Sequence, residues 1–437
     1  LYDLLRKHHP DFDAPKLTKE YIFNKLYPNK PFNDGLLRVL IREFTQMTEE
    51  YLLLLDIRSK DFQRKKMLSK IYQERNLYDF FQRATKKLIK QIEAEVYQNY
   101  EYYQDVYDLN FAYFFHPSTE KLPENDAPLL AMMDSLDKQY ALNKFRIGSE
   151  MLNRAKIYAK EYDIRLLEEL RKVTAKDFAK EDIHFQLFSL LFIFYESTGS
   201  EAVSVFEKLK LIFANNFEKL PRLDQSLFLT QLINFTVRKI NSGELNYYQE
   251  GLNLYKIGLK ADLVLEHGVI DEGVYGNIVA MGCQAKDFIW VKHFMDTYKS
   301  NLKEEIREDI YELNKGFYFF HQRDYKNALP QFMNHGYSPR FYFAARLNLL
   351  KTLYELFLKD PSLFDLLVSQ MNAFEKFLYR NTDENNYKKE IHLNFISVLR
   401  KLSNGILKKK SKEKLKSSIE HQIETRQKMV GKTWIYK

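Results

Sequence analysis

The sequence has one cysteine, Cys283, and few residues that interrupt helices, with 14 Gly and 11 Pro among 437 residues. A single cysteine cannot form an internal disulfide or a thiolate metal site. This usage fits a reducing compartment, so we expect a cytoplasmic protein. The scarcity of glycine disfavours hairpin-rich β-sandwiches and glycine-dependent phosphate loops. The composition therefore favours helices.

Long apolar runs are also missing. The longest, from Leu187 to Tyr195, has about half the length that a membrane-spanning helix needs, so we expect no membrane span. The 45% hydrophobic and 29% charged residues suffice for a core and a solvated surface. Because single cores stop growing at about 250 to 300 residues, we expect two domains or one extended repeat array.

The net charge of +8 is concentrated at the end of the chain. Residues 406–437 carry nine Lys and one Arg against three Glu, a net +7, so the other residues are close to neutral. Any attraction to RNA or another acidic partner is therefore expected here, with Lys408, Lys409, Lys410 and Lys412 as candidates. Alternatively, a lysine-rich end simply keeps the protein soluble.

A second basic zone lies between residues 58 and 90, where acidic residues are interspersed with the basic ones. This mixture favours a solvated helical face over a nucleic-acid site. The basic residues are Arg58, Lys60, Arg64, Lys65, Lys66, Lys70, Arg83, Lys86, Lys87 and Lys90.

Helical patterns cover most of the chain. Thr18 is a plausible cap for a helix that ends near Leu26, and Asn33 or Asp34 can cap a longer one. The apolar residues of that longer helix have spacings of three and four, which place them on one stripe. They are Leu37, Leu40, Ile41, Phe44, Met47, Tyr51 and Leu55.

Three prolines, Pro117, Pro123 and Pro128, lie in a polar stretch that cannot continue a helix. We therefore predict a subdomain boundary there. The expected organisation is a helical N-terminal subdomain (1–116), a loop or linker (117–128), a helical-repeat domain (129–405) and a basic C-terminal helix or tail (406–437).

No catalytic motif is present. None of the ten His falls at a metal-binding spacing, and Gly431-Lys432-Thr433 has Arg426 where a phosphate-binding loop needs its first glycine. Cys283 is interpreted as a buried, unreactive side chain. We predict no catalytic, cofactor-binding or metal-binding residues and no enzyme activity, although a site dispersed along the sequence would look the same.

Aromatic residues are dense between positions 97 and 115. The residues Tyr100, Tyr103, Tyr107, Phe111 and Phe114 share one helical stripe, which predicts burial. The residues outside this stripe are candidates for a partner surface that stacks bases or lines a peptide groove. They are Tyr97, Tyr102 and Tyr113.

One unit, containing Gly316, Phe319, Ala328 and Phe332 with Pro339 further on, has the spacings of the tetratricopeptide repeat, and its interhelical turn is Arg323-Asp324-Tyr325. Its second half recurs in Ala202 with Phe206, Gly251 with Tyr255, and Val291 with Met295. The chain therefore resembles tetratricopeptide-repeat proteins over about residues 187–339. The resemblance implies an all-α fold, an α-solenoid of helical hairpins, in which a small residue permits close helix crossing and the following aromatic residue fills the gap.

A second resemblance concerns the start of the chain, Leu17-Thr18-Lys19-Glu20 with Phe23 and Leu26-Tyr27-Pro28, then Asp34, Leu37-Arg38, Leu40-Ile41 and Phe44. This pattern is similar to the helix-turn-helix of bacterial transcriptional activators that carry tetratricopeptide-like repeats. It implies that the second helix enters the major groove, with Arg38 and Arg42 on phosphates. More helix replaces the expected wing strands, which removes part of the usual DNA contact.

Two functional hypotheses follow. The first is a non-catalytic scaffold or adaptor that binds another protein or peptide in a helical-repeat groove. The alternative is a nucleic-acid-binding regulator that uses the basic N-terminal helices and the lysine-rich tail. Salt distinguishes them, because binding to phosphates weakens steeply as the salt concentration rises.

Overall fold

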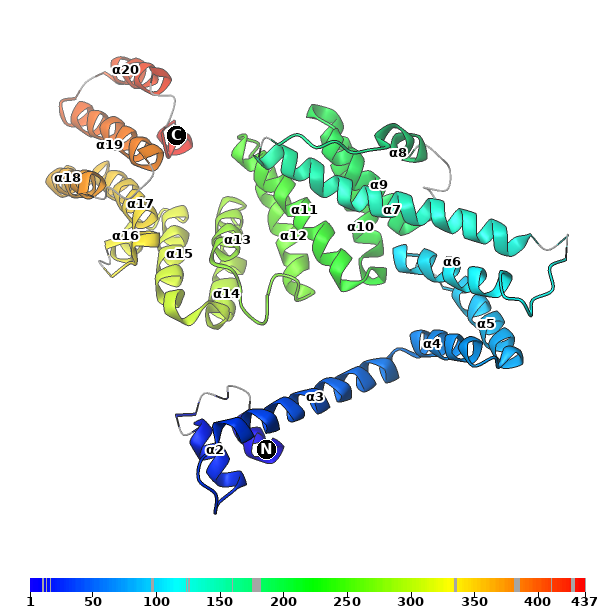
Figure 1. Cartoon of the computed structure of the whole chain (residues 1–437). Helices are drawn as coiled ribbons and strands as arrows, with labels where there is room; N and C mark the ends of the chain where they lie inside the picture. The colour runs from blue at the N-terminus through cyan, green and yellow to red at the C-terminus, as the bar shows by residue number, and fades with distance from the viewer. Residues whose placement is uncertain are drawn as a thin grey trace. The chain divides into compact units, whose positions relative to one another are not determined.

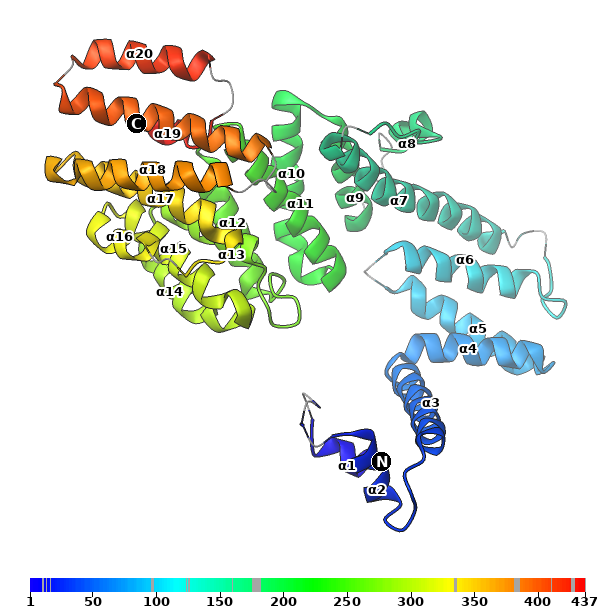
Figure 2. The same ribbon diagram turned by 60° about the vertical axis from the view of Figure 1, so that its left-hand side comes forward.

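The computed structural model describes the chain except for residues 10–11, 13, 16, 96–97, 123, 125, 159, 175–181, 334–335, 381–385, 410, 426–428 and 437. The fold is all-α, as predicted: the described residues form helices and short 3₁₀ turns (Figures 1 and 2). No strand occurs among these residues, where the one β-type contact is a bridge between Glu266 and Val269. The chain divides into two compact units, residues 1–216 and 217–437.

The N-terminal unit begins with two helices that were predicted from their caps. Thr18 accepts a hydrogen bond from the Tyr21 amide at the start of α2, and Asn33 accepts one from the Leu36 amide at the start of α3. These helices share a small core with Leu37 at its centre. The bounds are α1 (Tyr2–Arg6), α2 (Lys19–Leu26) and α3 (Asp34–Ser59).

The next four helices pack each against its neighbour. They are α4 (Asp61–Glu74), α5 (Tyr78–Glu93), α6 (Tyr100–Phe114) and α7 (Ala127–Tyr158). The proline-containing segment 117–128 joins α6 to α7, and these two helices pack together within one unit. The proline-containing segment therefore lies within the first unit, and the two units divide after Asn216.

Three helices complete this unit: α8 (Leu167–Thr174), α9 (Ile183–Glu196) and α10 (Gly199–Asn216). Helix α7 packs against both α8 and α9, and α9 packs against α10. Asp182 caps α9 by accepting hydrogen bonds from the His184 and Phe185 amides. It also accepts a 2.6 Å hydrogen bond from the Tyr103 hydroxyl, which ties α6 to the start of α9.

In the C-terminal unit consecutive helices from α11 to α20 pack against each other, and α15 also contacts α13 and α17. The helices are α11 (Arg222–Asn241), α12 (Tyr247–Lys260), α13 (Glu272–Gln284), α14 (Phe288–Tyr298), α15 (Arg307–His321), α16 (Tyr325–Met333), α17 (Pro339–Phe357), α18 (Phe364–Arg380), α19 (Asn386–Leu407), α20 (Lys412–Thr425) and α21 (Lys432–Ile435).

The small and aromatic positions singled out in the sequence do lie at helix contacts. A Cβ on Gly316 would lie 2.6 Å from the Phe332 ring, so α15 and α16 approach closely there. Phe332 and Ala328 are fully buried, and Arg323 lies in the predicted turn between these helices. This part of the packing prediction is confirmed.

Candidate partner-binding groove

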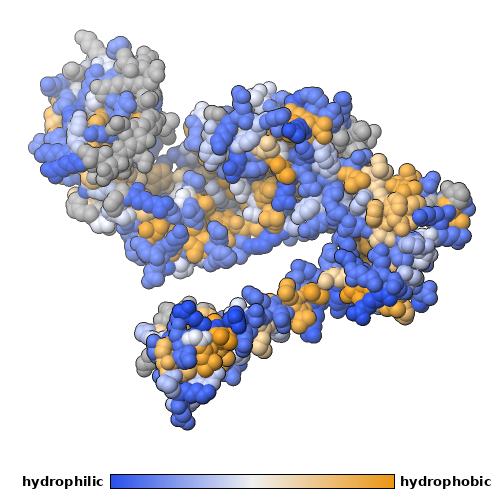
Figure 3. Space-filling model, viewed as in Figure 1, coloured by the Kyte–Doolittle hydropathy of each residue, from blue (hydrophilic) through white to orange (hydrophobic). Residues whose placement is uncertain are grey.

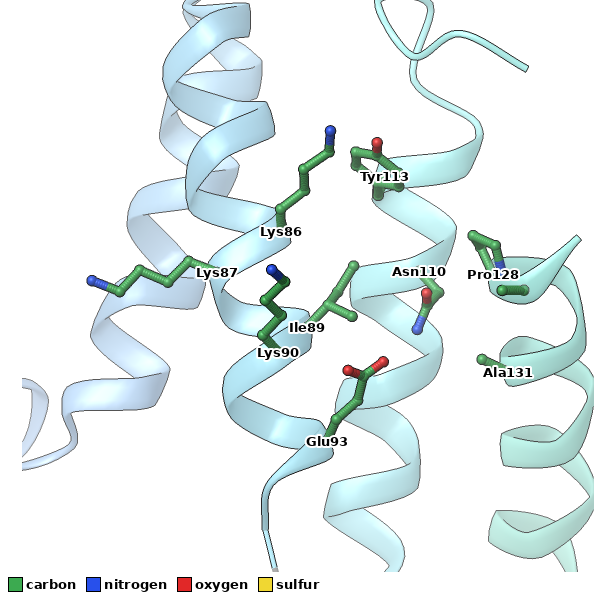
Figure 4. Close-up of a pocket in the computed structure, with 10 residues that line it drawn as sticks. Lys86, Lys87, Ile89, Lys90, Glu93, Asn110, Tyr113, Pro128 and Ala131 are labelled. Atoms are coloured by element: carbon green, nitrogen blue, oxygen red, sulfur yellow. The ribbon is translucent and has the colours of Figure 1, made fainter. Parts of the chain in front are cut away.

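A cavity of about 570 Å³ lies between α5, α6 and α7 in the N-terminal unit (Figure 4). Figure 4 shows Lys86 pointing toward Tyr113, with Ile89 between α5 and α6 and with Pro128 and Ala131 on the α7 side. The lining residues are Lys86, Lys87, Ile89, Lys90, Glu93, Asn110, Tyr113, Ala127, Pro128 and Ala131.

The pattern of α5 explains why lysines border this cavity. Its buried residues, Phe81, Thr85, Leu88 and Ile92, recur at spacings of three and four and form the face that packs inward. Lys86 and Lys90 lie one turn apart and are exposed. Their charged ends therefore border a cavity whose walls come from α6 and α7.

The groove combines a positive rim with an apolar lining. The Lys86 ammonium lies 5.5 Å from the centre of the Tyr113 ring, a cation–π distance. Among the described residues no ion pair involves Lys86, Lys87 or Lys90, and Glu93 is the single acidic residue of the lining. Such a surface suits a ligand that is both apolar and acidic.

Several other residues of the predicted basic zone form ion pairs within the chain. Lys60 pairs with Asp56, and Asp61 pairs with both Arg64 and Lys65. This confirms the prediction of a solvated, mixed-charge face for residues 60–65.

Lys66 bridges two carboxylates of α6, with its ammonium 2.5 Å from Asp105 and 2.8 Å from Asp108. Burial alone would lower the pKa of Lys66, but the hydrogen bonds that its ammonium donates to these carboxylates raise the pKa above its ordinary value. Lys66 therefore holds α4 against α6 through its two ion pairs, whereas the lysines of the groove enter no ion pair among the described residues.

A second cavity, of about 440 Å³, lies between α4, α5 and α6. At its base the hydroxyl groups of Ser69 and Thr85, both buried, share a 2.7 Å hydrogen bond. Its lining has two lysines, Lys66 and Lys70, and one carboxylate, Asp108, which pairs with Lys66, so it has fewer lysines than the first groove.

The aromatic prediction for α6 is corrected in part. Tyr103 is buried as predicted, but Tyr100 and Phe111 are 36% and 46% exposed, because Val106, Leu109 and Asn110 form the inward face with Tyr103. The α6 face that meets α5 and α7 is thus rotated from the aromatic stripe.

The three predicted aromatic site residues have different outcomes. Tyr113 lines the groove and is half-buried. Tyr102 is half-buried beside Leu88 and Val106, and burial raises the pKa of its hydroxyl, so it is part of the packing more than of an open surface. Tyr97 lies outside the described residues.

The predicted basic site residues are not brought together. Arg38 and Arg42 are exposed on α3, where the Arg38 guanidinium donates a 2.7 Å hydrogen bond to Asp34. Lys408 and Lys409 are exposed after α19, while Lys410 and the Lys412 side chain lie outside the described part of the chain. Helix α20 packs on α19 through Ile419 and Ile423, so this end of the chain is partly folded.

The sequence analysis missed the groove because it assigned Lys86 and Lys90 to a solvated face. A distinguishing signal is present: Lys86 and Lys87 have no acidic residue three or four positions away, whereas Lys60 and Lys65 have one. The contribution of α7 could not be read from the sequence, since it depends on which helix packs beside α6.

Several other features bear on chemistry. Cys283 is buried, as interpreted from the sequence, and burial raises the pKa of its thiol to about 12. Within the described residues no three His, Cys, Asp or Glu side chains are grouped to hold a metal ion. No helix of the described chain has the length and apolar character needed to cross a bilayer.

Comparison with family models, curated proteins and solved structures found no match for this chain.

Proposed function

We propose that the protein is a non-catalytic adaptor and that the groove between α5, α6 and α7 binds an acidic, amphipathic segment of a partner protein. The observation that carries this proposal is the set of three lysines, outside the ion pairs of the described residues, around an apolar cavity. Acidic side chains of the segment would pair with Lys86 and Lys90. Its apolar side chains would occupy the cavity beside Ile89 and Ala131.

The helical hairpins support the scaffold part of this proposal. In our proposal, α11 to α16 form a divergent tetratricopeptide-like stack. The second helix of each hairpin carries a small or branched residue followed four positions later by a large apolar one: Gly251 with Tyr255, Val291 with Met295, and Ala328 with Phe332. A stack of this kind supplies a rigid support while the N-terminal unit carries the partner site.

Nucleic-acid binding is the second candidate, and the same lysines are what favours it. The apolar lining favours a protein segment, because phosphates are not stabilised by Ile89 or Ala131. The intramolecular pairs of Lys60, Arg64 and Lys65 also remove charge from the predicted basic surface.

The test is an affinity capture from the lysate of the source cell, with and without nuclease, using the intact chain and the double variant Lys86→Glu, Lys90→Glu. The charge-matched control is Lys172→Glu with Lys208→Glu, two exposed lysines outside the groove. We expect a defined protein that is lost with the groove variant and retained with the control. Identical protein sets for all three baits would contradict the proposal, and material lost on nuclease treatment would favour the second candidate.

A further inference from the structure

Helix α3 exposes an unusual amount of apolar surface. Of its 26 residues, Leu37 is buried, near the start. The five consecutive residues Tyr51 to Leu55 are each 43 to 63% exposed. Figure 3 shows the resulting apolar area toward the α4 end of α3. Large exposed apolar patches on soluble proteins mark contact sites.

This end of α3 requires a concave binding site. Successive residues on a helix point about 100° apart, so five consecutive apolar residues cover its whole circumference. A flat partner surface would cover one side of α3 and leave the opposite side, at Leu53, exposed to water. A groove bordered by several helices covers more of the apolar circumference of α3.

The charges of α3 specify the chemistry of this binding site. Between Gln46 and Ile57 the helix carries Glu49, Glu50 and Asp56 and no basic residue. Asp56 pairs with Lys60, whereas Glu49 and Glu50 enter no ion pair among the described residues. The segment is therefore apolar and acidic, and its complement is apolar with a basic rim.

Pairing of α3 with another α3 does not meet this requirement. Glu43 and Glu50 lie two turns apart on the same edge of the apolar stripe. In an antiparallel pair Glu43 of one chain faces Glu50 of the other, which brings like charges together and costs stability. In a parallel pair these glutamates face the opposite edge of the partner helix, where Thr48 and Leu55 lie, so they gain no basic partner.

The groove between α5, α6 and α7 does meet it, with Lys86 and Lys90 on its rim and Ile89, Pro128 and Ala131 in its lining. We propose that the Gln46–Ile57 segment of α3 from a second copy of this chain binds in this groove. Mutual exchange of the two α3 helices closes a two-fold dimer. The inference rests on the proposed function of the groove, because it names a ligand for the same site.

The size of the contact follows from the length of the bound segment. The Gln46–Ile57 segment has 12 residues and is about 18 Å long, and a standard interface takes about 800 Å² from each partner. A reciprocal exchange makes this contact twice. One dimer therefore buries the apolar end of both α3 helices.

The first measurement is the molar mass of the intact chain by light scattering across a range of micromolar concentrations. Two variants test the contact: the α3 variant Glu49→Lys, Glu50→Lys and the groove variant Lys86→Glu, Lys90→Glu. Each should weaken dimerisation at least about tenfold, since each places like charges together. The control Lys172→Glu, Lys208→Glu should dimerise as the unchanged chain does. Circular dichroism checks that all variants are folded.

Mixing the two variants is the decisive step. The basic α3 of one variant then fits the acidic groove of the other, and the two unchanged elements fit as before, so the mixture should form a dimer although neither variant does so alone. A chain that stays monomeric, a dimer that survives the groove variant, or a mixture that stays monomeric would each overturn the proposal. After any of these results, the capture experiment could still find a partner protein that binds the intact chain and not the groove variant. The dimer proposal can therefore fail while the proposed function of the groove stands.

Discussion

At the scale of single residues, burial opposes the charge of Lys351 more strongly than a neighbouring ring supports it. Its ammonium lies 5.9 Å from the centre of the Trp434 ring, at the outer limit of a cation–π contact. Burial lowers the pKa of Lys351 from 10.5 to about 8. The charged form is thus less stable in the folded chain than in the unfolded one.

This shift predicts a pH dependence of stability. Between pH 8 and 10.5 the unfolded chain holds the Lys351 proton and the folded chain releases it, so stability rises with pH in this window. We expect Lys351→Met to stabilise the protein by about 1 to 3 kcal/mol at pH 7 and to flatten the rise above pH 8. Urea unfolding at several pH values measures both effects.

The matched control is Lys376→Met, an exposed lysine on α18. It should leave both the stability at pH 7 and the pH dependence unchanged. Equal slopes for the unchanged chain and Lys351→Met would show that Lys351 keeps its proton and that the environment described here is wrong.

Gly282 is a second residue whose role is decided by its neighbour. A Cβ at this position would lie 2.2 Å from a methyl carbon of Val291, so α13 and α14 approach too closely for any side chain. We expect Gly282→Ala to destabilise the C-terminal unit by about 1 to 3 kcal/mol through overpacking. Gly276→Ala, on the same helix with its nearest neighbour 3.8 Å away, should gain up to about 1 kcal/mol from helix propensity. Thermal unfolding that ranks the two variants in the opposite order would refute this account.

At the scale of secondary-structure elements, the start of α9 depends on one carboxylate. Asp182 accepts hydrogen bonds from two α9 amides and from the Tyr103 hydroxyl, and burial raises its pKa. Asp182→Ala should cost about 2 kcal/mol, because it removes the cap and the shorter of the two hydrogen bonds that the Tyr103 hydroxyl donates, the other being to Gln98. Asp182→Asn keeps an acceptor oxygen and removes the buried charge, so it should lose less than about 1 kcal/mol. Chemical denaturation compares the two, and equal losses would speak against the capping role.

The elements were predicted best where local chemistry decides them. Thr18 and Asn33 cap α2 and α3 by accepting hydrogen bonds from amides three residues further on, and the turn at Arg323 depends on its own short segment. The α3 stripe identified an apolar face correctly. Periodicity cannot say what covers such a face, and most of this one is exposed.

Helix α6 shows why the aromatic pattern failed. Tyrosine has a polar hydroxyl and tolerates partial exposure, as at Tyr100, whereas exposing the aliphatic side chains of Val106 and Leu109 to water costs more free energy. The inward face therefore follows the aliphatic residues. The groove at Lys86 was missed because its opposite wall includes Pro128 of α7, and the sequence does not show that these two distant segments lie together.

At the scale of the whole molecule, the chain divides into two compact units, and we predict that a substitution in one unit changes the stability of that unit alone. Phe332 and Phe145 are both fully buried, one in each unit. Phe332→Ala should cost about 3 to 5 kcal/mol and speed hydrogen exchange around α15 to α17 while leaving α4 to α7 protected. Phe145→Ala should give the reverse pattern. Exchange that rises in both units for either variant would indicate one cooperative structure.

The placement of the two tryptophans has a practical consequence for such experiments. Trp290 stacks on Phe294 in α14, and Trp434 in α21 donates a hydrogen bond to Glu355, so both belong to the C-terminal unit. Intrinsic tryptophan fluorescence therefore reports on residues 217–437 alone, whereas far-ultraviolet circular dichroism reports on every helix. Unfolding curves from the two methods should differ in midpoint whenever the units differ in stability, and this difference would measure their independence without a label or an added probe.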